Sequence, residues 1–180
     1  YCGLSIPEQR NEAIREMTGD WVWFVDDDHS FEPDTLNRLL ATGKEIIQPL
    51  CVTRSPPFST PAFHLFNGSE LRQVSPDMLP AERGLLPCTT VGAGCLLVRK
   101  RVLEAMARSE GLERQQFQLD AQVQVMIDRY PFMAHYVAAW RQEQATHWFR
   151  FSHPEKLRED MDFCLRARAL GFSLFKRLAD

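Results

Sequence analysis

Short apolar runs alternate along the chain with segments in which apolar residues recur at helical spacing, and this pattern is typical of an α/β domain. Trp21 to Val25 is continuously apolar and rich in aromatic and β-branched residues. It predicts a strand buried on both faces, as at the centre of a sheet. Cys95 to Val98 and Phe172 to Leu178 predict two further strands. Glu45 to Val52 predicts another, in which Pro49 requires a break or an edge position.

Helical spacing marks the segments that would cover such a sheet. The pattern predicts helices at Pro7 to Thr18, Pro33 to Thr42 and Arg101 to Ser109. The strongest helical signal covers Ser152 to Leu170, where Ser152 and Glu155 match a capping box and Gly171 follows the last turn. Weaker helical patterns cover Gln115 to Asp128 and Phe132 to Gln144.

The segment from Thr53 to Pro87 differs in composition from the rest of the chain, because it holds six of the eleven prolines and shows little apolar periodicity. We predict a long loop region there, with room for one hairpin. Long loops within a compact domain are often functional.

The length, composition and charge of the chain argue against several classes of protein function. A length of 180 residues suits one domain, with 44% hydrophobic and 25% charged residues, as in ordinary globular proteins. The net charge of −3 argues against general nucleic-acid binding, which needs a basic excess. No apolar run is long enough to span a bilayer. The five cysteines are scattered without a CxxC pair, which argues against zinc or a disulfide framework and favours free thiols in a cytoplasmic protein.

Three carboxylates, Asp26, Asp27 and Asp28, directly follow the first apolar strand. Open α/β sheets bind ligands beyond the carboxyl ends of their strands. In an extended segment Asp26 and Asp28 point the same way. Two hard oxygen ligands suit Mg²⁺ or Mn²⁺, with a substrate diphosphate completing the shell. The alternative interpretation is an acidic turn that caps the next helix.

Three further groups are candidates for a site. Glu159 or Asp160 could act as a general base, although acidic residues in a first helical turn also stabilise the helix dipole without any active site. Gly92, Ala93 and Gly94 allow close backbone approach to a ligand, or simply form a turn before a strand. Arg10, next to Asn11, could contact a phosphate or be solvated at the surface.

The order of these motifs resembles the GT-A glycosyltransferases of family 2. The motifs are Arg10-Asn11, Asp26-Asp27-Asp28, Gly92-Ala93-Gly94 leading into an apolar strand, and Glu159-Asp160. The resemblance implies a GT-A-like (Rossmann-like) mixed sheet flanked by helices. It also implies metal-dependent transfer of a sugar, with inversion, from a nucleotide-sugar to the hydroxyl of a carbohydrate or other acceptor.

The resemblance also implies residue roles. Asp28 would bind Mn²⁺ or Mg²⁺ directly, and Asp26 would face the same metal or the ribose. Asp160 would deprotonate the acceptor, and Glu159 would orient it. The positions expected to lie around the donor and acceptor are Arg10, Asn11, Asp27, Gly92, Ala93, Gly94 and Trp148, the last followed by Phe149.

Two departures from the family pattern affect the expectations. The chain has no room before Arg10 for the βαβ segment that binds the nucleotide base, so we expect an N-terminally truncated domain over residues 1–180. Its exposed sheet edge would favour a homo-oligomer. Met106 to Thr146 exceeds the family's spacer, which we interpret as a helical insertion, 106–146. The alternatives are a metal-dependent nucleotidyl- or phosphotransferase and a non-catalytic domain that binds a sugar or a partner.

Overall fold

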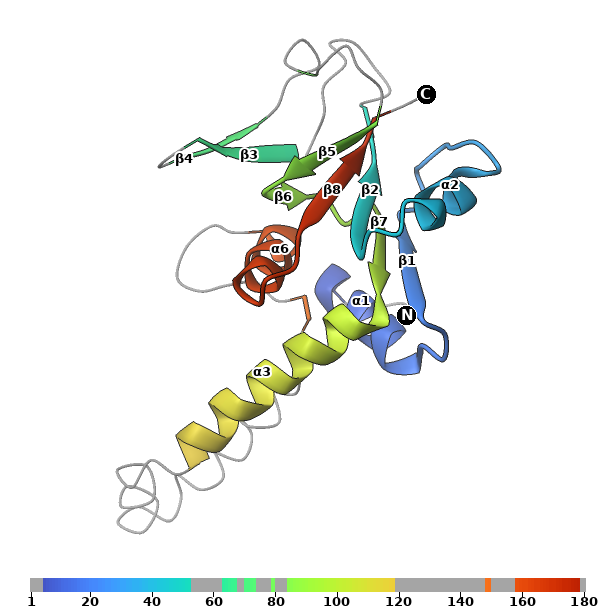
Figure 1. Cartoon of the computed structure of the whole chain (residues 1–180). Coiled ribbons are helices and arrows are strands. Elements are labelled where there is room, and N and C mark those ends of the chain that lie inside the picture. Colours follow the sequence, from blue (N-terminus) through green and yellow to red (C-terminus); the bar gives the residue numbers. More distant parts are fainter. Residues whose placement is uncertain are drawn as a thin grey trace.

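The computed structural model describes residues 5–52, 63–67, 70–73, 79, 84–118, 148–149 and 158–178. The helices are α1 (Ile6–Glu16), α2 (Thr35–Ala41), α3 (Lys100–Gln118) and α6 (Glu159–Ala169). The strands are β1 (Trp21–Val25), β2 (Ile46–Pro49), β3 (Phe63–Asn67), β4 (Glu70–Gln73), β5 (Leu85–Cys88), β6 (Thr90–Val91), β7 (Cys95–Arg99) and β8 (Leu174–Arg177). This mixed α/β architecture agrees with the GT-A-like fold that the sequence predicts (Figure 1).

A five-stranded mixed sheet forms the centre, in the order β1-β7-β2-β8-β5. Strands β2 and β8 are parallel, β7 runs antiparallel to β1 and β2, and β5 runs antiparallel to β8. The β1 and β7 strands pair along their whole length, from Trp21 opposite Arg99 to Val25 opposite Cys95. This register places the residue after β1, Asp26, beside the residue before β7, Gly94.

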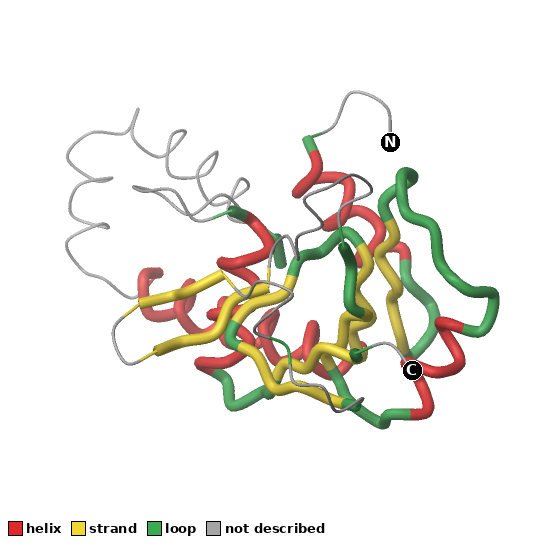
Figure 2. Tube along the Cα trace, turned by 90° about the horizontal axis from the view of Figure 1, so that it is seen from above, coloured by secondary structure: helices red, strands yellow, loops and turns green. Residues whose placement is uncertain are grey.

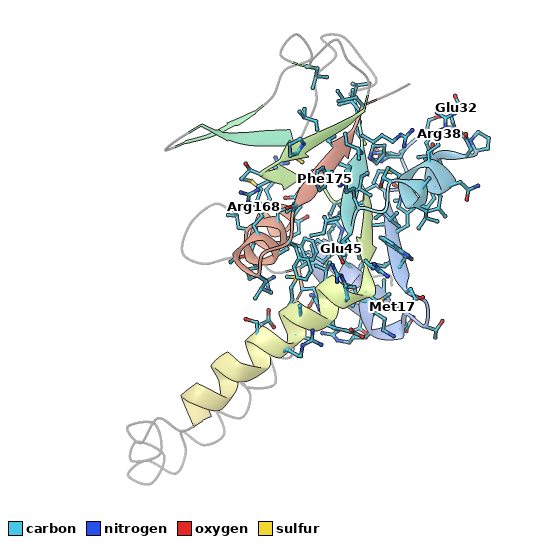
Figure 3. All side chains as sticks on the ribbon, viewed as in Figure 1. Met17, Glu32, Arg38, Glu45, Arg168 and Phe175 are labelled. Atoms are coloured by element: carbon cyan, nitrogen blue, oxygen red, sulfur yellow. The ribbon has the colours of Figure 1, made fainter. Side chains whose placement is uncertain are left out.

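Helices cover both faces of this sheet, and each face has its own apolar cluster (Figure 2). The larger cluster joins α1, β1, α3 and α6 through Ile14, Phe24, Val102, Met106, Phe163 and Ala167. The smaller one centres on Leu39 of α2, Ile47 of β2 and Leu97 of β7, with Phe175 packed against it (Figure 3). Within the described residues, the sheet is therefore the middle layer between α2 on one face and α1, α3 and α6 on the other.

Strand β1 has the predicted bounds but not the predicted place. Within the described part of the chain it pairs only with β7, so it is an edge strand and not a central one. The strand is nevertheless continuously apolar, because side chains from other elements cover both of its faces. Val22 and Phe24 pack into the larger cluster, while Trp21 and Trp23 pack against the smaller one. Only Phe24 of β1 is buried, however, and Trp21, Val22 and Trp23 are half-buried, so the prediction of a strand buried on both faces holds only in part. The apolar run carried no information about which strands pair with β1.

The proline-rich region contains more strand than we predicted. The β3–β4 hairpin confirms the expected hairpin, and it forms a second sheet in the order β4-β3-β6. The β5 strand, however, lies in a segment predicted as loop. Pro87 is tolerated there because β5 is at the edge of the main sheet, where a strand needs hydrogen bonds on one side only. Pro49 causes the predicted break instead, since β2 is a central strand and ends at that residue.

The later helices differ from the prediction in their bounds. Helix α3 continues to Gln118, well beyond Ser109, and extends away from the sheet (Figure 1). Helix α6 begins at Glu159 and not at Ser152, because the Arg158 backbone just before it is extended, with φ −65° and ψ 155°. The proposed capping box at Ser152, and most of the expected 106–146 insertion, lie outside the described residues. Among the helices described, none is both long and apolar enough to cross a membrane.

Candidate active site

A tight turn follows β1 and carries the three consecutive carboxylates. The Asp26 N–H donates to the Gly94 carbonyl at 2.7 Å, which ties the start of the turn to β7. The His29 N–H donates back to the Asp26 carbonyl at 3.2 Å and closes the turn. The side chains of Asp26 and Asp28 are 50% and 68% exposed, and Asp27 is exposed between them. The turn therefore presents carboxylates to solvent at the end of a strand.

Asp26, Asp28 and His29 form a compact set of possible metal ligands. One ligand atom from each lies within 4.8 Å of the other two, and His29 Nδ1 is 3.3 Å from Asp28 Oδ1. Gly94 makes this approach possible, because a Cβ there would lie 2.7 Å from Asp26 Oδ2 and 2.9 Å from His29 Cε1. Sequence reasoning selected both aspartates but missed His29, whose only signal was its position directly after Asp28.

Arg10 of α1 connects this turn to the start of α6. Its guanidinium donates through Nη1 to Glu159 Oε1 at 2.7 Å and through Nη2 to Asp26 Oδ1 at 3.5 Å. The Arg10 and Glu159 side chains are only 10% and 15% exposed. The Arg10 guanidinium also lies over the Phe149 ring, 5.4 Å from its centroid. Two acidic motifs far apart in the sequence therefore meet at one partly buried arginine.

Asp160 is buried at the first turn of α6. Its Oδ1 accepts a hydrogen bond from the Met161 N–H at 2.8 Å. Burial, and next the charge of Glu159, raise the pKa of Asp160 above its usual range, while the Met161 N–H and the charge of Arg10 act in the opposite direction. A carboxylate whose pKa is raised toward neutrality is a stronger proton acceptor once it is ionised.

The Gly92–Gly94 segment has one end beside α6 and the other at the carboxylate turn. At the first end, the Cys164 thiol of α6 lies 3.4 Å from both the Val91 N–H nitrogen and the Val91 carbonyl oxygen. Asp160 lies one helical turn before Cys164 on α6. At the other end, the Gly94 carbonyl accepts from the Asp26 N–H.

Asn11 and Trp148 hold the Phe149 backbone in place. Asn11 is 1% exposed, donates to the Phe149 carbonyl at 2.8 Å and accepts from the Phe149 N–H at 3.0 Å. The Trp148 indole N–H donates to the Leu103 carbonyl of α3 at 2.9 Å. Phe149 in turn stacks on Phe163 of α6, with ring centroids 4.6 Å apart. Both polar atoms of Asn11 are used inside the protein, which makes Asn11 a positioning residue beneath Arg10.

Asp162 is occupied differently from Asp160, although it is also buried and lies two residues later. Its Oδ2 accepts from Arg166 Nε at 2.7 Å, one turn along the same helix. Arg166 also bonds the Trp148 carbonyl. Asp162 therefore belongs to the packing of α6 and makes a suitable control for Asp160.

A group of thiols lies behind the carboxylate turn. The pKa of Cys51 is lowered to about 6, first by the hydrogen bond from Cys95 and then by the charge of Lys176 and by His29, against the effect of burial. Lys176 is fully buried and donates to Gln48 Oε1 at 3.0 Å, and burial lowers its pKa. As the sequence predicts, the cysteines of the described residues are free thiols: Cys51, Cys88, Cys95 and Cys164.

Comparison with known protein families places most of the first half of the chain in one family. Residues 5–105, more than half of the chain, match the family described as glycosyl transferase family 2. The matched range contains Arg10, the carboxylate turn and Gly94, while the α6 carboxylates lie beyond it. No curated protein matches the chain.

Proposed function

Because this chain belongs to glycosyltransferase family 2, we propose that it transfers a sugar from a nucleotide-sugar donor to a hydroxyl acceptor with the help of a divalent cation. The observation that carries the proposal is the position of Arg10 between Asp26 and Glu159. It links Asp26, one of a carboxylate pair suited to a metal-bound diphosphate, to Glu159, the residue next to Asp160, whose carboxylate is suited to proton transfer. Glycosyl transfer needs both groups at one site.

Asp26 and Asp28 would hold the cation, Mn²⁺ or Mg²⁺. Two features support the fit. The donor atoms are carboxylate oxygens, which these cations prefer, and Gly94 leaves free the space in which the ligands converge. When bound, the cation would offset the negative charge that develops on the departing nucleoside diphosphate. Asp26 would keep its orientation through its backbone bond to Gly94 and its contact with Arg10.

Asp160 would accept the proton of the acceptor hydroxyl. Its burial and its raised pKa support this role, and the neighbouring Glu159 is engaged as the partner of Arg10. A direct displacement with inversion needs one base and one stabilised leaving group, and the two halves of this site would supply them. The Gly92–Gly94 segment would line the space in which sugar and acceptor meet, since glycines allow a ligand to approach the backbone closely.

Product analysis tests this proposal. The chain would be incubated with Mn²⁺, a mixture of simple glycosides as acceptors, and uridine, guanosine or thymidine diphosphate sugars in turn. We expect release of the nucleoside diphosphate, together with a glycosylated acceptor. Release of pyrophosphate would instead indicate a nucleotidyltransferase.

Matched variants assign the roles in the same assay. Asp28→Asn and Asp160→Asn should each abolish most of the release, and Asp162→Asn should leave most of it. If Asp162→Asn were the crippling change and Asp160→Asn a mild one, the choice of base would be wrong.

A further inference from the structure

His29 faces the same space as the two proposed metal ligands. The turn that the Asp26 carbonyl closes with the His29 N–H brings the imidazole back over Gly94. The ring is close enough that a Cβ at Gly94 would lie 2.9 Å from His29 Cε1. The imidazole and the Asp26 carboxylate therefore converge above a residue that has no side chain.

His29 Nδ1 is a buried nitrogen that lacks a hydrogen-bond partner among the residues that the structure describes. Buried polar atoms are nearly always paired, so an unpaired one needs an explanation. The nitrogen lies 3.3 Å from Asp28 Oδ1. Adjacent ligands around an octahedral cation with bonds of about 2.1 Å are separated by about 3 Å. Nδ1 and Asp28 Oδ1 are thus spaced as two neighbouring ligands of one ion.

The His29 ring has a second neighbour, the Cys51 thiol, whose pKa it helps to lower. Metal-binding histidines are commonly held in orientation by such further contacts of the ring.

We propose that His29 Nδ1 is a third protein ligand of the cation held by Asp26 and Asp28, and that it makes the site prefer Mn²⁺ to Mg²⁺. The inference rests on the proposed metal site. Its reason is the chemistry of the nitrogen donor: Mg²⁺ prefers oxygen ligands and keeps its waters, whereas imidazole suits transition metals. Two aspartates alone would discriminate little between the two ions.

Pulsed electron paramagnetic resonance on the chain loaded with Mn²⁺ alone tests the ligand directly. Coordinated imidazole gives a nitrogen modulation, which changes when ¹⁵N-histidine replaces ordinary histidine. We expect this modulation in the native chain and its loss in His29→Asn. His64→Asn, on β3 of the other sheet, is the matched control and should retain it.

Competition between Mn²⁺ and Mg²⁺ tests the selectivity. Asn places an oxygen or nitrogen near the position of Nδ1, so His29→Asn should still bind both ions. We expect the preference for Mn²⁺ to fall by about tenfold, the scale on which changes in a metal's ligand environment act. An unchanged ratio would overturn the claim about selectivity.

The outcomes separate the two proposals. Mn²⁺ binding that Asp28→Asn abolishes, without nitrogen modulation in the native chain, would overturn the His29 ligand and leave the carboxylate site standing. No Mn²⁺ binding at all would overturn both. Modulation that persists in a folded His29→Asn variant would assign the nitrogen to another histidine and overturn the inference. The native spectrum needs no variant, so the test stands even if His29→Asn fails to fold.

Discussion

Gly94→Ala should damage the proposed metal site while leaving the fold nearly intact. The Gly94 backbone does not adopt a left-handed conformation, so alanine adds no backbone strain there. The added Cβ, however, would lie 2.7 Å from Asp26 Oδ2 and 2.9 Å from His29 Cε1. Both atoms belong to the side chains proposed as ligands, and both would have to move.

The size of the movement follows from ordinary contact distances. Asp26 Oδ2 would have to withdraw by about 0.7 Å, from 2.7 Å to the 3.4 Å at which ordinary contact begins. A misplacement of about 1 Å at a catalytic site can cost about 10²-fold. We therefore expect Mn²⁺ affinity to fall by about tenfold or more. Asp26 is half exposed and can rotate outward, so the loss of unfolding free energy should stay within about 1 kcal/mol.

Titration calorimetry with Mn²⁺, alongside thermal unfolding, checks both quantities. Gly19→Ala is the matched control, because a Cβ there meets nothing closer than the Trp21 carbonyl oxygen at 3.9 Å. It should bind Mn²⁺ as the native chain does. Native affinity in a folded Gly94→Ala variant would refute the reasoning, since it would show that the ion does not sit between Asp26 and His29.

Other changes have distinct expected outcomes. Asp160→Asn should lower turnover by about 10²-fold or more, measured as nucleoside diphosphate release. Burial raises the folded pKa of Asp160, so this carboxyl stabilises the fold below its unfolded pKa of 3.8 and loses that contribution as pH rises through the folded pKa. Asp160→Asn should therefore raise Tm at pH 7. A gain in Tm that persists undiminished at pH 3 would contradict a raised pKa for Asp160 in the folded protein. Arg10→Ala should cost about 3 kcal/mol in chemical denaturation, because it leaves the nearly buried Glu159 carboxylate unpaired, whereas Arg15→Ala, from a more exposed pair, should cost less than about 1 kcal/mol. Asn11→Ala should cost about 2 kcal/mol in the same assay, because the buried backbone groups of Phe149 lose their partners, and a neutral result would exclude the positioning role.

Local patterns in the sequence predicted much of the fold. The apolar run at Trp21–Val25 and the carboxylates after it were recognisable because a strand and its end are encoded by adjacent residues. The edge position of β1 could not be recognised from the sequence, since a side-chain pattern shows which faces of a strand are covered and not which strands pair with it. Strand β5 was not predicted because it contains Pro87, and a strand tolerates proline chiefly at the edge of a sheet.

The candidate site depends more strongly on contacts between distant segments. The bridge from Arg10 to Glu159 requires α1 and the start of α6 to pack together, and no local pattern around either residue encodes that contact. Asn11 was expected near the donor because the resemblance to family 2 implied it, but its amide is used on the Phe149 backbone. His29 was missed because a single histidine after three aspartates resembles an ordinary turn residue. Only the closure of the turn brings its Nδ1 toward Asp28.

Calorimetric titration with nucleoside diphosphates, in the presence and absence of Mn²⁺, tests the central claim most directly. If Asp26 and Asp28 hold the donor diphosphate through a cation, the native chain should bind a nucleoside diphosphate with Mn²⁺ and lose that binding when the metal is chelated. Asp28→Asn should lose it as well, and Asp34→Asn, a carboxylate paired with Arg38 beside α2, should not. Equal binding with and without Mn²⁺, or by Asp28→Asn, would contradict the account.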